Sequence, residues 1–471
     1  MNEVAIASRP VERFADVLPA EDFRRFTDDV GEATRRLAGR TLWHVNSTAE
    51  GGGVAEMLQS ILGYLTESGL PVRWLVIDGN DEFFAVTKRI HHLLHGQPGD
   101  EGPLGDTERE IYEQALAAQL PDLIDRIGDG DAVILHDPQT LGLAPALAAA
   151  GARVVWSCHV GADEPNDHAR RAWEFLAPYT SQTTHQVFSR RQYSWDNLDP
   201  SRVAVIPPCI DAFSAKNQLL DDDVVAAILD AAGVIPDPAA VGEPEYEGRD
   251  GAPGRVARRA TMIEDEPVPS DAAVVVQVSR WDPLKDHIGV MTGFCEHGPN
   301  GANSHLVLVG PDPASVTDDP EGEQSLRDLE TARNALPADQ RRRVHIACLP
   351  MDDIDENAAI VNALQRRADV VVQKSLAEGF GLTVAEAMWK ARPVVGSRVG
   401  GIQDQIESEV TGVLVDPEDL ATFGEALRAL LDDRSTAGAM GKRAHARVAE
   451  EYLAPCYLAR FLELAVARTP R

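Results

Sequence analysis

The stretch SLAEGFGLTVAEAMWKARPVVGSRVGG, residues 375–401, carries two glutamates eight positions apart around a Gly-Phe-Gly turn. The apolar run at 369–372 before it predicts a short buried strand, and residues 383–390 predict a helix of good helix formers. Gly379 and Gly381 then lie where the helix begins, and the N–H groups and dipole of a first helical turn favour an anion. The stretch therefore predicts an anion-binding turn between a strand and a helix.

The two glutamates, Glu378 in the turn and Glu386 in the helix, need partners other than the anion. Carboxylates beside an anion are electrostatically unfavourable unless they accept hydrogen bonds from neutral hydroxyls. A nucleotide sugar offers both kinds of group: a diphosphate for the turn, sugar hydroxyls for Glu378 and ribose hydroxyls for Glu386. The pattern therefore predicts a nucleotide-sugar site.

A second motif, VSRWDPLKD at 278–286, follows the apolar run 273–278 and precedes another helical pattern. Its two cations, Arg280 and Lys285, are candidates to neutralise a diphosphate. The chain contains six lysines against 38 arginines, so a lysine at this position is a stronger signal than it would be in a lysine-rich chain. The alternative is a pair of surface cations at a helix start, where the helix dipole disfavours them.

Together these motifs resemble the E-x7-E signature and the diphosphate-binding segment of retaining GT-B glycosyltransferases of the GT4 type. Longer segments resemble trehalose glycosyltransferring synthases, which join glucose from a nucleotide sugar to free glucose: WHVNSTAEGGGVAEML at 43–58, HDPQ at 136–139 and residues 362–402. The similarity spans most of residues 41–470. It implies an α/β GT-B fold, two Rossmann-like parallel-sheet domains facing across a cleft, and a retaining glucosyltransferase that makes trehalose.

The resemblance also implies roles for single residues. Glu378 would orient the donor sugar, and His159 would lie near its anomeric carbon. Arg280 and Lys285 would neutralise the leaving nucleoside diphosphate. The remaining substrate-binding candidates are Gly52, Gly53, Asp137, Phe380, Gly381, Leu382, Thr383 and Glu386.

Four of these candidates follow from their places in the first half of the chain. Glycines let a backbone approach a ligand closely, and Gly52 and Gly53 are expected to contact donor phosphate or sugar, although a tight turn also needs glycine. His159 follows a predicted strand, at the edge where open α/β sheets bind ligands, with a structural histidine as the alternative. Residues 136–139, which include Asp137, line the acceptor pocket or form a simple turn.

Strand-like and helix-like runs alternate along the chain, which predicts parallel α/β sheets. Strands are expected at 41–46, 72–77, 132–135, 153–157 and 203–206 in a first domain, and at 273–278, 305–309, 344–346, 370–372, 393–395 and 412–415 in a second.

The expected domain order starts with a helical N-terminal extension, residues 1–39. An N-terminal acceptor domain follows at 40–212, and a nucleotide-sugar domain at 213–451. Residues 236–271 are rich in proline, glycine and acids and predict a surface insert. The last helix, in 452–471, is expected to join the first domain.

The composition of the chain argues against two classes of binding partner. A net charge of −31 and a pI near 4.7 argue against nucleic acid or anionic membrane as partners. Five scattered cysteines without a CxxC pair fit a reducing cytosol, and the start lacks the pattern of a signal peptide. We expect a cytoplasmic protein with small-molecule substrates, NDP-glucose and glucose. The sequence leaves the oligomeric state open, a homodimer included.

No metal or other cofactor is expected. His91 and His95 lie one helical turn apart, but no carboxylate or cysteine stands at ligand spacing beside them. The acidic run 221–223 lies in a helical pattern and is typical of a solvated face. The reaction is therefore expected to be metal-independent, with cationic side chains in place of a divalent ion.

Three alternatives remain open from the sequence. A retaining trehalose phosphorylase would use inorganic phosphate where the synthase uses a nucleoside diphosphate. A GT4 glucosyltransferase could take another small acceptor. A non-catalytic sugar-nucleotide sensor could use the same scaffold.

Overall fold

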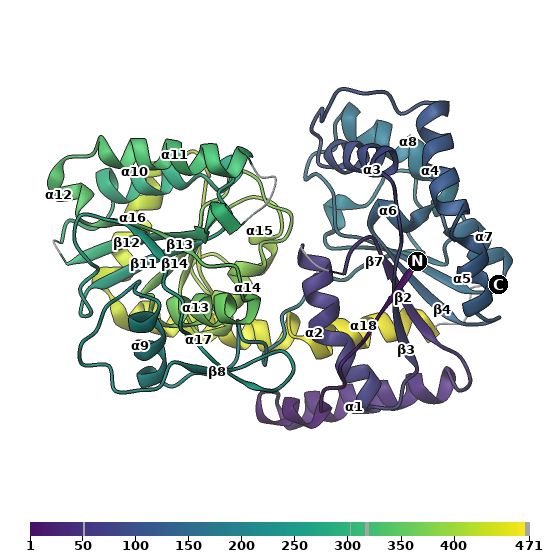
Figure 1. Cartoon of the computed structure of the whole chain (residues 1–471), viewed down its shortest axis with the longest axis horizontal. Coiled ribbons are helices and arrows are strands. Elements are labelled where there is room, and N and C mark those ends of the chain that lie inside the picture. The colour runs from purple at the N-terminus through teal and green to yellow at the C-terminus, as the bar shows by residue number, and fades with distance from the viewer. Residues whose placement is uncertain (50–51, 302, 316–319, 467–471) are drawn as a thin grey trace. The chain divides into compact units, whose positions relative to one another are not determined.

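The computed structural model describes residues 1–49, 52–301, 303–315 and 320–466. The chain divides into two compact units (Figure 1). The first comprises Met1–Cys209 with Leu453–Arg471, and the second comprises Ile210–Tyr452. From the sequence, the two boundaries are expected at 212/213 and 451/452.

In its described residues, the first unit contains one sheet with strand order β1-β3-β2-β4-β5-β6-β7. All neighbours are parallel except β1, which runs antiparallel to β3. The strands are β1 (Asn2–Val4), β2 (Leu42–Asn46), β3 (Val72–Val76), β4 (Ala132–His136), β5 (Arg153–Cys158), β6 (His185–Phe188) and β7 (Val203–Val205). β1 lies in the segment expected to be helical, and its sequence NEV contains only one apolar residue. β6 was missed because its sequence HQVF contains only two apolar residues.

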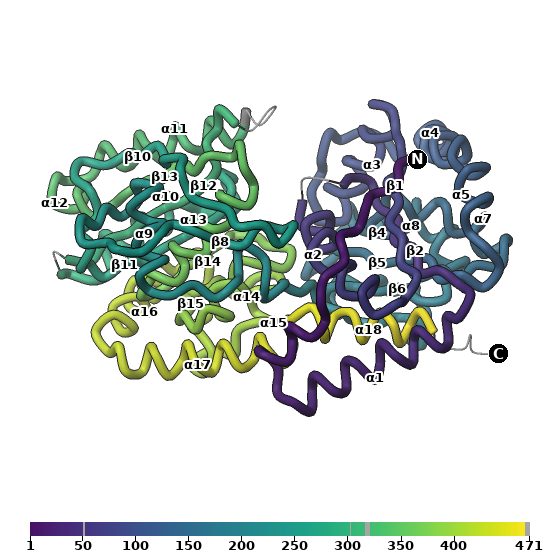
Figure 2. Tube along the Cα trace, turned by 60° about the horizontal axis from the view of Figure 1, so that its bottom comes forward, coloured from purple at the N-terminus to yellow at the C-terminus, as the bar shows by residue number. Residues whose placement is uncertain are grey.

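Helices cover this sheet, and the C-terminal helix packs against two of its strands. The helices are η1 (Val11–Asp16), α1 (Ala20–Arg36), α2 (Gly53–Glu67), α3 (Asp81–Leu94), α4 (Asp106–Ala117), α5 (Leu120–Arg126), α6 (Asp137–Leu141), α7 (Ala144–Ala149), α8 (Asp167–Thr180), η2 (Arg191–Tyr193) and α18 (Ala454–Val466). α18 lies beside α1 and contacts β4 and β5 (Figure 2). Arg153 Nη1 donates to the carbonyl oxygen of Ala465 at 2.9 Å, which ties the helix to β5.

The described residues of the second unit form a sheet of order β10-β13-β12-β11-β14-β15-β16 and a separate hairpin, β8-β9. Its strands are β8 (Glu245–Glu247), β9 (Pro253–Arg255), β10 (Thr261–Ile263), β11 (Ala273–Val278), β12 (Ser304–Pro311), β13 (Val344–Leu349), β14 (Val370–Gln373), β15 (Val394–Ser397) and β16 (Val413–Val415). β10 runs antiparallel to β13, and the other neighbours in the sheet are parallel.

The predicted insert, 236–271, is partly built into this sheet rather than being only a surface excursion. It contains β8, β9 and β10. Beside β10, Glu264 Oε2 lies 2.7 Å from Nδ1 of the buried His345, whose Nε2 lies 2.9 Å from Nδ1 of His305. This chain of polar contacts ties the end of the insert to two central strands.

The helices of the second unit alternate with its strands. They are α9 (Asp222–Ala231), η3 (Pro283–Lys285), α10 (His287–His297), η4 (Pro313–Ser315), α11 (Pro320–Asn334), α12 (Ala338–Arg341), α13 (Ile354–Arg367), α14 (Leu382–Trp389), α15 (Ile402–Gln405), α16 (Leu420–Asp432) and α17 (Arg434–Glu451). No helix in the described part of the chain is both long enough and apolar enough to cross a membrane.

Strand order determines where each unit can bind a ligand. In the first unit the order reverses between β2 and β4, and in the second between β11 and β14. Loops that leave such neighbouring strands diverge to opposite sides of the sheet, and open α/β sheets bind ligands in the crevice between them. Residues 47–49, which follow β2, and residues 136–139 lie at the first reversal. The two motifs predicted to bind a diphosphate lie at the second.

Gly441 on α17 tests how tightly this helix packs behind α14. A Cβ at Gly441 would lie 2.0 Å from the carbonyl oxygen of Ala391, whereas a Cβ at Gly438 would meet nothing within 4 Å. We expect Gly441→Ala to lower the free energy of unfolding by about 1–3 kcal/mol, because the turn after α14 must move. Gly438→Ala on the same helix should be neutral or stabilising by up to about 1 kcal/mol. Denaturant unfolding of the two variants measures the difference, and equal stabilities would contradict the packing.

Candidate active site

The neighbouring strands β11 and β14 end in the same pattern, V-V-V-Q-x-S, at 274–279 and 370–375. Both glutamines are buried at the carboxyl ends of their strands. Gln277 Nε2 donates to the carbonyl oxygen of Lys285 at 2.9 Å, and Gln373 Nε2 donates to Ser375 Oγ at 3.0 Å. These polar residues were not predicted as site residues, although the repeated pattern at two strand ends is a signal that could have identified them.

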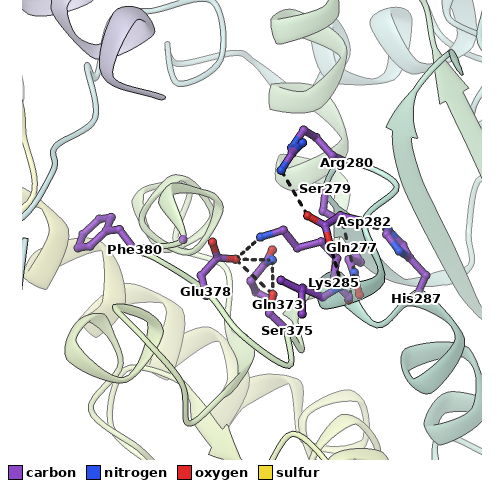
Figure 3. A network of polar contacts seen from close by, with 12 residues as sticks. Gln277, Ser279, Arg280, Asp282, Lys285, His287, Gln373, Ser375, Glu378 and Phe380 are labelled. Atoms are coloured by element: carbon purple, nitrogen blue, oxygen red, sulfur yellow. Dashed lines mark hydrogen bonds and ion pairs between the residues drawn. The ribbon is translucent and has the colours of Figure 1, made fainter. Parts of the chain in front are cut away.

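Lys285 and Glu378 lie in direct contact, although they are 93 positions apart in the sequence. Lys285 Nζ donates to Glu378 Oε2 at 2.6 Å, and the two side chains are only 15% and 13% exposed. Ser375 Oγ and Gln373 Nε2 donate to the same oxygen at 3.2 and 3.4 Å (Figure 3). A cation and a carboxylate from the two predicted motifs thus form one hydrogen-bonded cluster.

Arg280 lies apart from this contact. Its side chain is 71% exposed, and its Nη2 pairs with Asp282 Oδ2 at 3.3 Å (Figure 3). The structure therefore brings Lys285, and not Arg280, against Glu378. Arg280 presents its charge at the surface of the same loop.

The turn after Glu378 requires glycine. Gly381 precedes the first residue of α14 with φ +80°, in the left-handed region that glycine adopts without strain. Helix geometry leaves the first N–H groups of α14, those of Leu382 and Thr383, without partners inside the helix. Phe380 is mostly buried, and its carbonyl oxygen accepts a hydrogen bond from Gln405 Nε2 at 2.6 Å.

Glycines after β15 close against the same turn. A Cβ at Gly400 would lie 1.7 Å from the carbonyl oxygen of Glu378, and Gly401 N donates to the carbonyl oxygen of Gly379 at 2.9 Å. The Glu378 loop is therefore held on one side by the cluster with Lys285 and on the other by a glycine backbone.

Glu386 lies in a different setting from Glu378. It is 7% exposed, and Lys216 Nζ lies 3.8 Å from its Oε1. Lys390 Nζ donates to Asn217 Oδ1 at 2.9 Å and to the carbonyl oxygen of Glu386 at 3.0 Å. Burial lowers the pKa of Lys390 well below its ordinary value, and the neighbouring carboxylate of Glu386 opposes that shift. Lys216, Asn217 and Lys390 were not predicted as site residues.

In the first unit, three imidazoles stack across neighbouring strands. The rings of His44 and His136 are 5.3 Å apart, with Nδ1 of the former 3.1 Å from Nε2 of the latter. The rings of His136 and His159 are 5.8 Å apart and nearly parallel. His44 and His136 were not among the predicted site residues, and a histidine inside an otherwise apolar strand, as in LWHVN, is the signal that could have found the first of them.

Asp137 positions His159. It has φ +60°, and its Oδ1 accepts a hydrogen bond from the backbone N–H of His159 at 2.8 Å. Trp156 Nε1 donates to the carbonyl oxygen of Asp137 at 2.9 Å. The structure thus brings two predicted residues, Asp137 and His159, together.

The two predicted glycines lie at the start of α2. Gly52 has φ +98° and Gly53 is the first residue of the helix, while Glu50 and Gly51 lie outside the described residues.

Burial keeps these imidazoles neutral. It lowers the pKa of His44 to about 3 and that of His136 well below its ordinary value. Burial also lowers the pKa of His159, with the nearby carboxylate of Asp137 opposing the shift. At neutral pH each ring therefore has one N–H donor and one acceptor nitrogen.

The described residues contain no group of three or more His, Cys, Asp or Glu that could hold a metal ion. The rings of His91 and His95 are 4.9 Å apart and edge to face, and burial lowers the pKa of His91 to about 4. All five cysteines are free thiols.

Comparison with known proteins identifies the family to which this chain belongs. The family model of the trehalose synthase N-terminal domain matches residues 44–195, and that of glycosyl transferases group 1 matches residues 258–447. The chain is 33% identical over 441 residues to trehalose synthase of Rubrobacter xylanophilus, covering 92% of this chain and 91% of the relative. It is 31% identical over 455 residues to that of Thermococcus litoralis, covering 94% and 96%. The chain belongs to the trehalose synthase family.

More distant matches agree in fold. Trehalose phosphorylase of Pleurotus sajor-caju is 24% identical over 79% of this chain, and this chain covers 50% of that protein. The structure of HepE from Anabaena in complex with UDP and glucose superposes with a TM-score of 0.60 at 14% identity, covering 90% of this chain and 98% of that one. The predicted GT-B fold is confirmed, and the chain is a trehalose-related glycosyltransferase.

The buried histidine stack makes the stability of the first unit depend on pH. Because the folded state holds His44 neutral down to about pH 3, an unfolded chain takes up a proton that the folded chain does not as pH falls below about 6.5. Stability therefore falls as pH decreases between 6.5 and 3. Replacing His44 by Met should reduce this slope by about 1.4 kcal/mol per pH unit. Denaturant unfolding at pH 5.5 and 4.5 measures the slope, and an unchanged slope in the variant would contradict this account.

Proposed function

We propose that this protein is a retaining glucosyltransferase that makes trehalose from a nucleoside diphosphate glucose and free glucose. The observation that carries the proposal is the contact of Lys285 with Glu378 beside the N-terminus of α14, in a chain of the trehalose synthase family. A cation, a carboxylate and a helix N-terminus in one place suit a ligand with both anionic phosphates and neutral hydroxyls.

The reaction breaks the bond between the glucose C1 and the diphosphate oxygen, and it forms a bond from C1 to the acceptor oxygen on the same face. The acceptor proton passes to the leaving diphosphate oxygen, so no protein base is consumed. Lys285, Arg280 and the first N–H groups of α14 stabilise the charge that develops on that oxygen. Glu378 orients the donor sugar, and Glu386 binds the ribose. Catalysis then rests on positioning and on charge stabilisation.

The first unit binds the transferred sugar and the acceptor in this proposal. His159, neutral and held by Asp137 through its backbone N–H, presents a donor or an acceptor to sugar hydroxyls. Gly52, with its left-handed φ, allows close approach of backbone N–H groups to the donor. HepE, which has the same fold, is described with UDP and glucose bound, and this supports the choice of substrates.

The reaction is proposed to need no divalent metal, because Lys285 and Arg280 supply the positive charge that a metal brings to other nucleotide-sugar sites. The runner-up function is trehalose phosphorolysis, which the match to trehalose phosphorylases favours. Inorganic phosphate has no ribose, so the buried carboxylate of Glu386 would lose the partner proposed for it.

A product screen tests the proposal directly. Incubation with UDP-, ADP- and GDP-glucose and either glucose or glucose 6-phosphate should yield trehalose from glucose, with activity that survives exhaustive EDTA treatment. Product analysis by anion-exchange chromatography distinguishes trehalose from its phosphate. A faster formation of trehalose phosphate would overturn the acceptor, and turnover restored only by magnesium would overturn the metal-free reaction. Cleavage of trehalose by phosphate without nucleotide would favour the phosphorylase.

Removal of the buried cation should be costly. Lys285→Ala should lose about 2–4 kcal/mol of transition-state stabilisation, measured as kcat/KM, because one preorganised charge donor at the leaving group is gone. Lys88, exposed on α3 of the first unit, is the matched control, and Lys88→Ala should keep its activity. Activity of Lys285→Ala within about threefold of the unmodified enzyme would show that the lysine does not serve the reaction.

The two glutamates should separate kinetically. Glu386→Ala should chiefly raise KM for the donor and weaken binding of free nucleoside diphosphate, because a ribose contact is alike in ground and transition states. Glu378→Ala should chiefly lower kcat. Initial-rate kinetics and calorimetric titration of the nucleotide measure both effects, and identical defects in the two variants would refute the division of roles.

A further inference from the structure

Lys374 is a lysine buried completely at the end of a central strand. It follows Gln373, the last residue of β14, and its side chain is 0% exposed. In the matching pattern at the end of β11 the same position is occupied by Val278. A buried ammonium needs a specific partner, because an unpaired buried charge is strongly destabilising.

The partner is Asp286, which follows Lys285 directly. Lys374 Nζ donates to Asp286 Oδ2, and Asp286 Oδ1 accepts from the N–H of Gly289 at 3.1 Å. Asp286 has φ +51° and stands between η3, which ends at Lys285, and α10. It therefore fixes the backbone at the point where the Lys285 loop becomes a helix.

Three contacts join the loop after β11 to the loop after β14. Asp286 pairs with Lys374, Leu284 O accepts from Leu376 N at 2.8 Å, and Lys285 pairs with Glu378 at 2.6 Å. Lys374 is fully buried, whereas Lys285, the lysine of the other ion pair, is 15% exposed. The contact of Lys374 with Asp286 lies at the base of the two loops, where they leave neighbouring strands.

The negative charge of Asp286 links its contact with Lys374 to ligand binding. Asp286 is a carboxylate next to the lysine proposed to bind a diphosphate. Lys374 neutralises it, and without Lys374 the carboxylate would attract Lys285 away from the phosphates. This effect weakens the site through Lys285.

We propose that Lys374 is a positioning residue for diphosphate binding. By pairing with Asp286, it fixes the loop that carries Lys285, and it leaves the ammonium of Lys285 available to the diphosphate. The inference rests on the proposed nucleotide-sugar function of this site. It assigns Lys374 no contact with the substrate.

The test measures binding of free nucleoside diphosphate by calorimetry, using whichever diphosphate the unmodified enzyme binds. Lys374→Met should weaken binding at least about tenfold, as expected when one partner of a buried charge pair is removed. In a Lys285→Ala background the same substitution should have little further effect, because its influence passes through Lys285. A merely structural role would lower affinity by the same factor in both backgrounds, and that result, or unchanged affinity in Lys374→Met, overturns the inference.

Two further variants make the test robust. Asp286→Asn with Lys374→Met removes both charges and should bind the diphosphate more tightly than Lys374→Met alone, even if the single variant is unstable. Equal or weaker binding by the double variant counts against the proposal. Lys442→Met, at an exposed position on α17 of the same unit, is the matched control and should bind like the unmodified enzyme. An unmodified enzyme that binds none of the diphosphates would instead refute the proposed function.

Discussion

The ion pair between Lys285 Nζ and Glu378 Oε2, 2.6 Å long and largely buried, is the interaction on which the second unit's site depends. Parallel strands β11 and β14 end at the same edge of the sheet, and their two loops contact each other there before they diverge. A buried cation in one loop and a buried carboxylate in the other each need compensation, and each is the other's nearest source of it. The glycines at 381 and 400 follow from this constraint, because the carboxylate's loop is enclosed closely on both sides.

The same pair limits what a ligand can do at the site. A diphosphate that draws Lys285 toward itself weakens the hold of Lys285 on Glu378, and a sugar hydroxyl can then donate to the carboxylate. Ser375 and Gln373 keep hydrogen bonds to the carboxylate meanwhile, so the anion is not left without donors. A ligand carrying both phosphate and hydroxyls satisfies both partners at once, whereas a phosphate alone satisfies only the lysine.

The sequence predicted the parallel strands well where they are buried on both faces, because such strands are continuous apolar runs. β11 was predicted to the residue, and β14 to within one. The three-residue edge strands β7 and β16 were also predicted, whereas β1, β6 and β10 were missed: β1 and β10 each have three residues, and β6 begins with two polar ones. Their pairing comes from neighbouring strands and not from their own pattern.

The site was predictable in part for a similar reason. Glu378, Glu386 and Lys285 stand in motifs that are local in sequence. Their contacts are not local: the Lys285–Glu378 pair depends on the register of β11 against β14, and Lys216 approaches Glu386 from a segment 170 positions earlier. The histidine stack likewise needs the register of β2 against β4, which no single strand reveals.

Lysine usage shows how strongly these contacts constrain the chain. Of its six lysines, Lys88 and Lys442 are exposed on helices, while the other four lie in the contacts around Glu378, Asp286 and Glu386: Lys216, Lys285, Lys374 and Lys390. The chain contains 38 arginines. An ammonium is a compact charge on a flexible stem, whereas a guanidinium is a planar fork that prefers bidentate partners. A slot as closed as that of Lys374, and a cation proposed to exchange a carboxylate for a phosphate, both suit the smaller group, which agrees with the use of lysine at these positions in a chain that otherwise favours arginine.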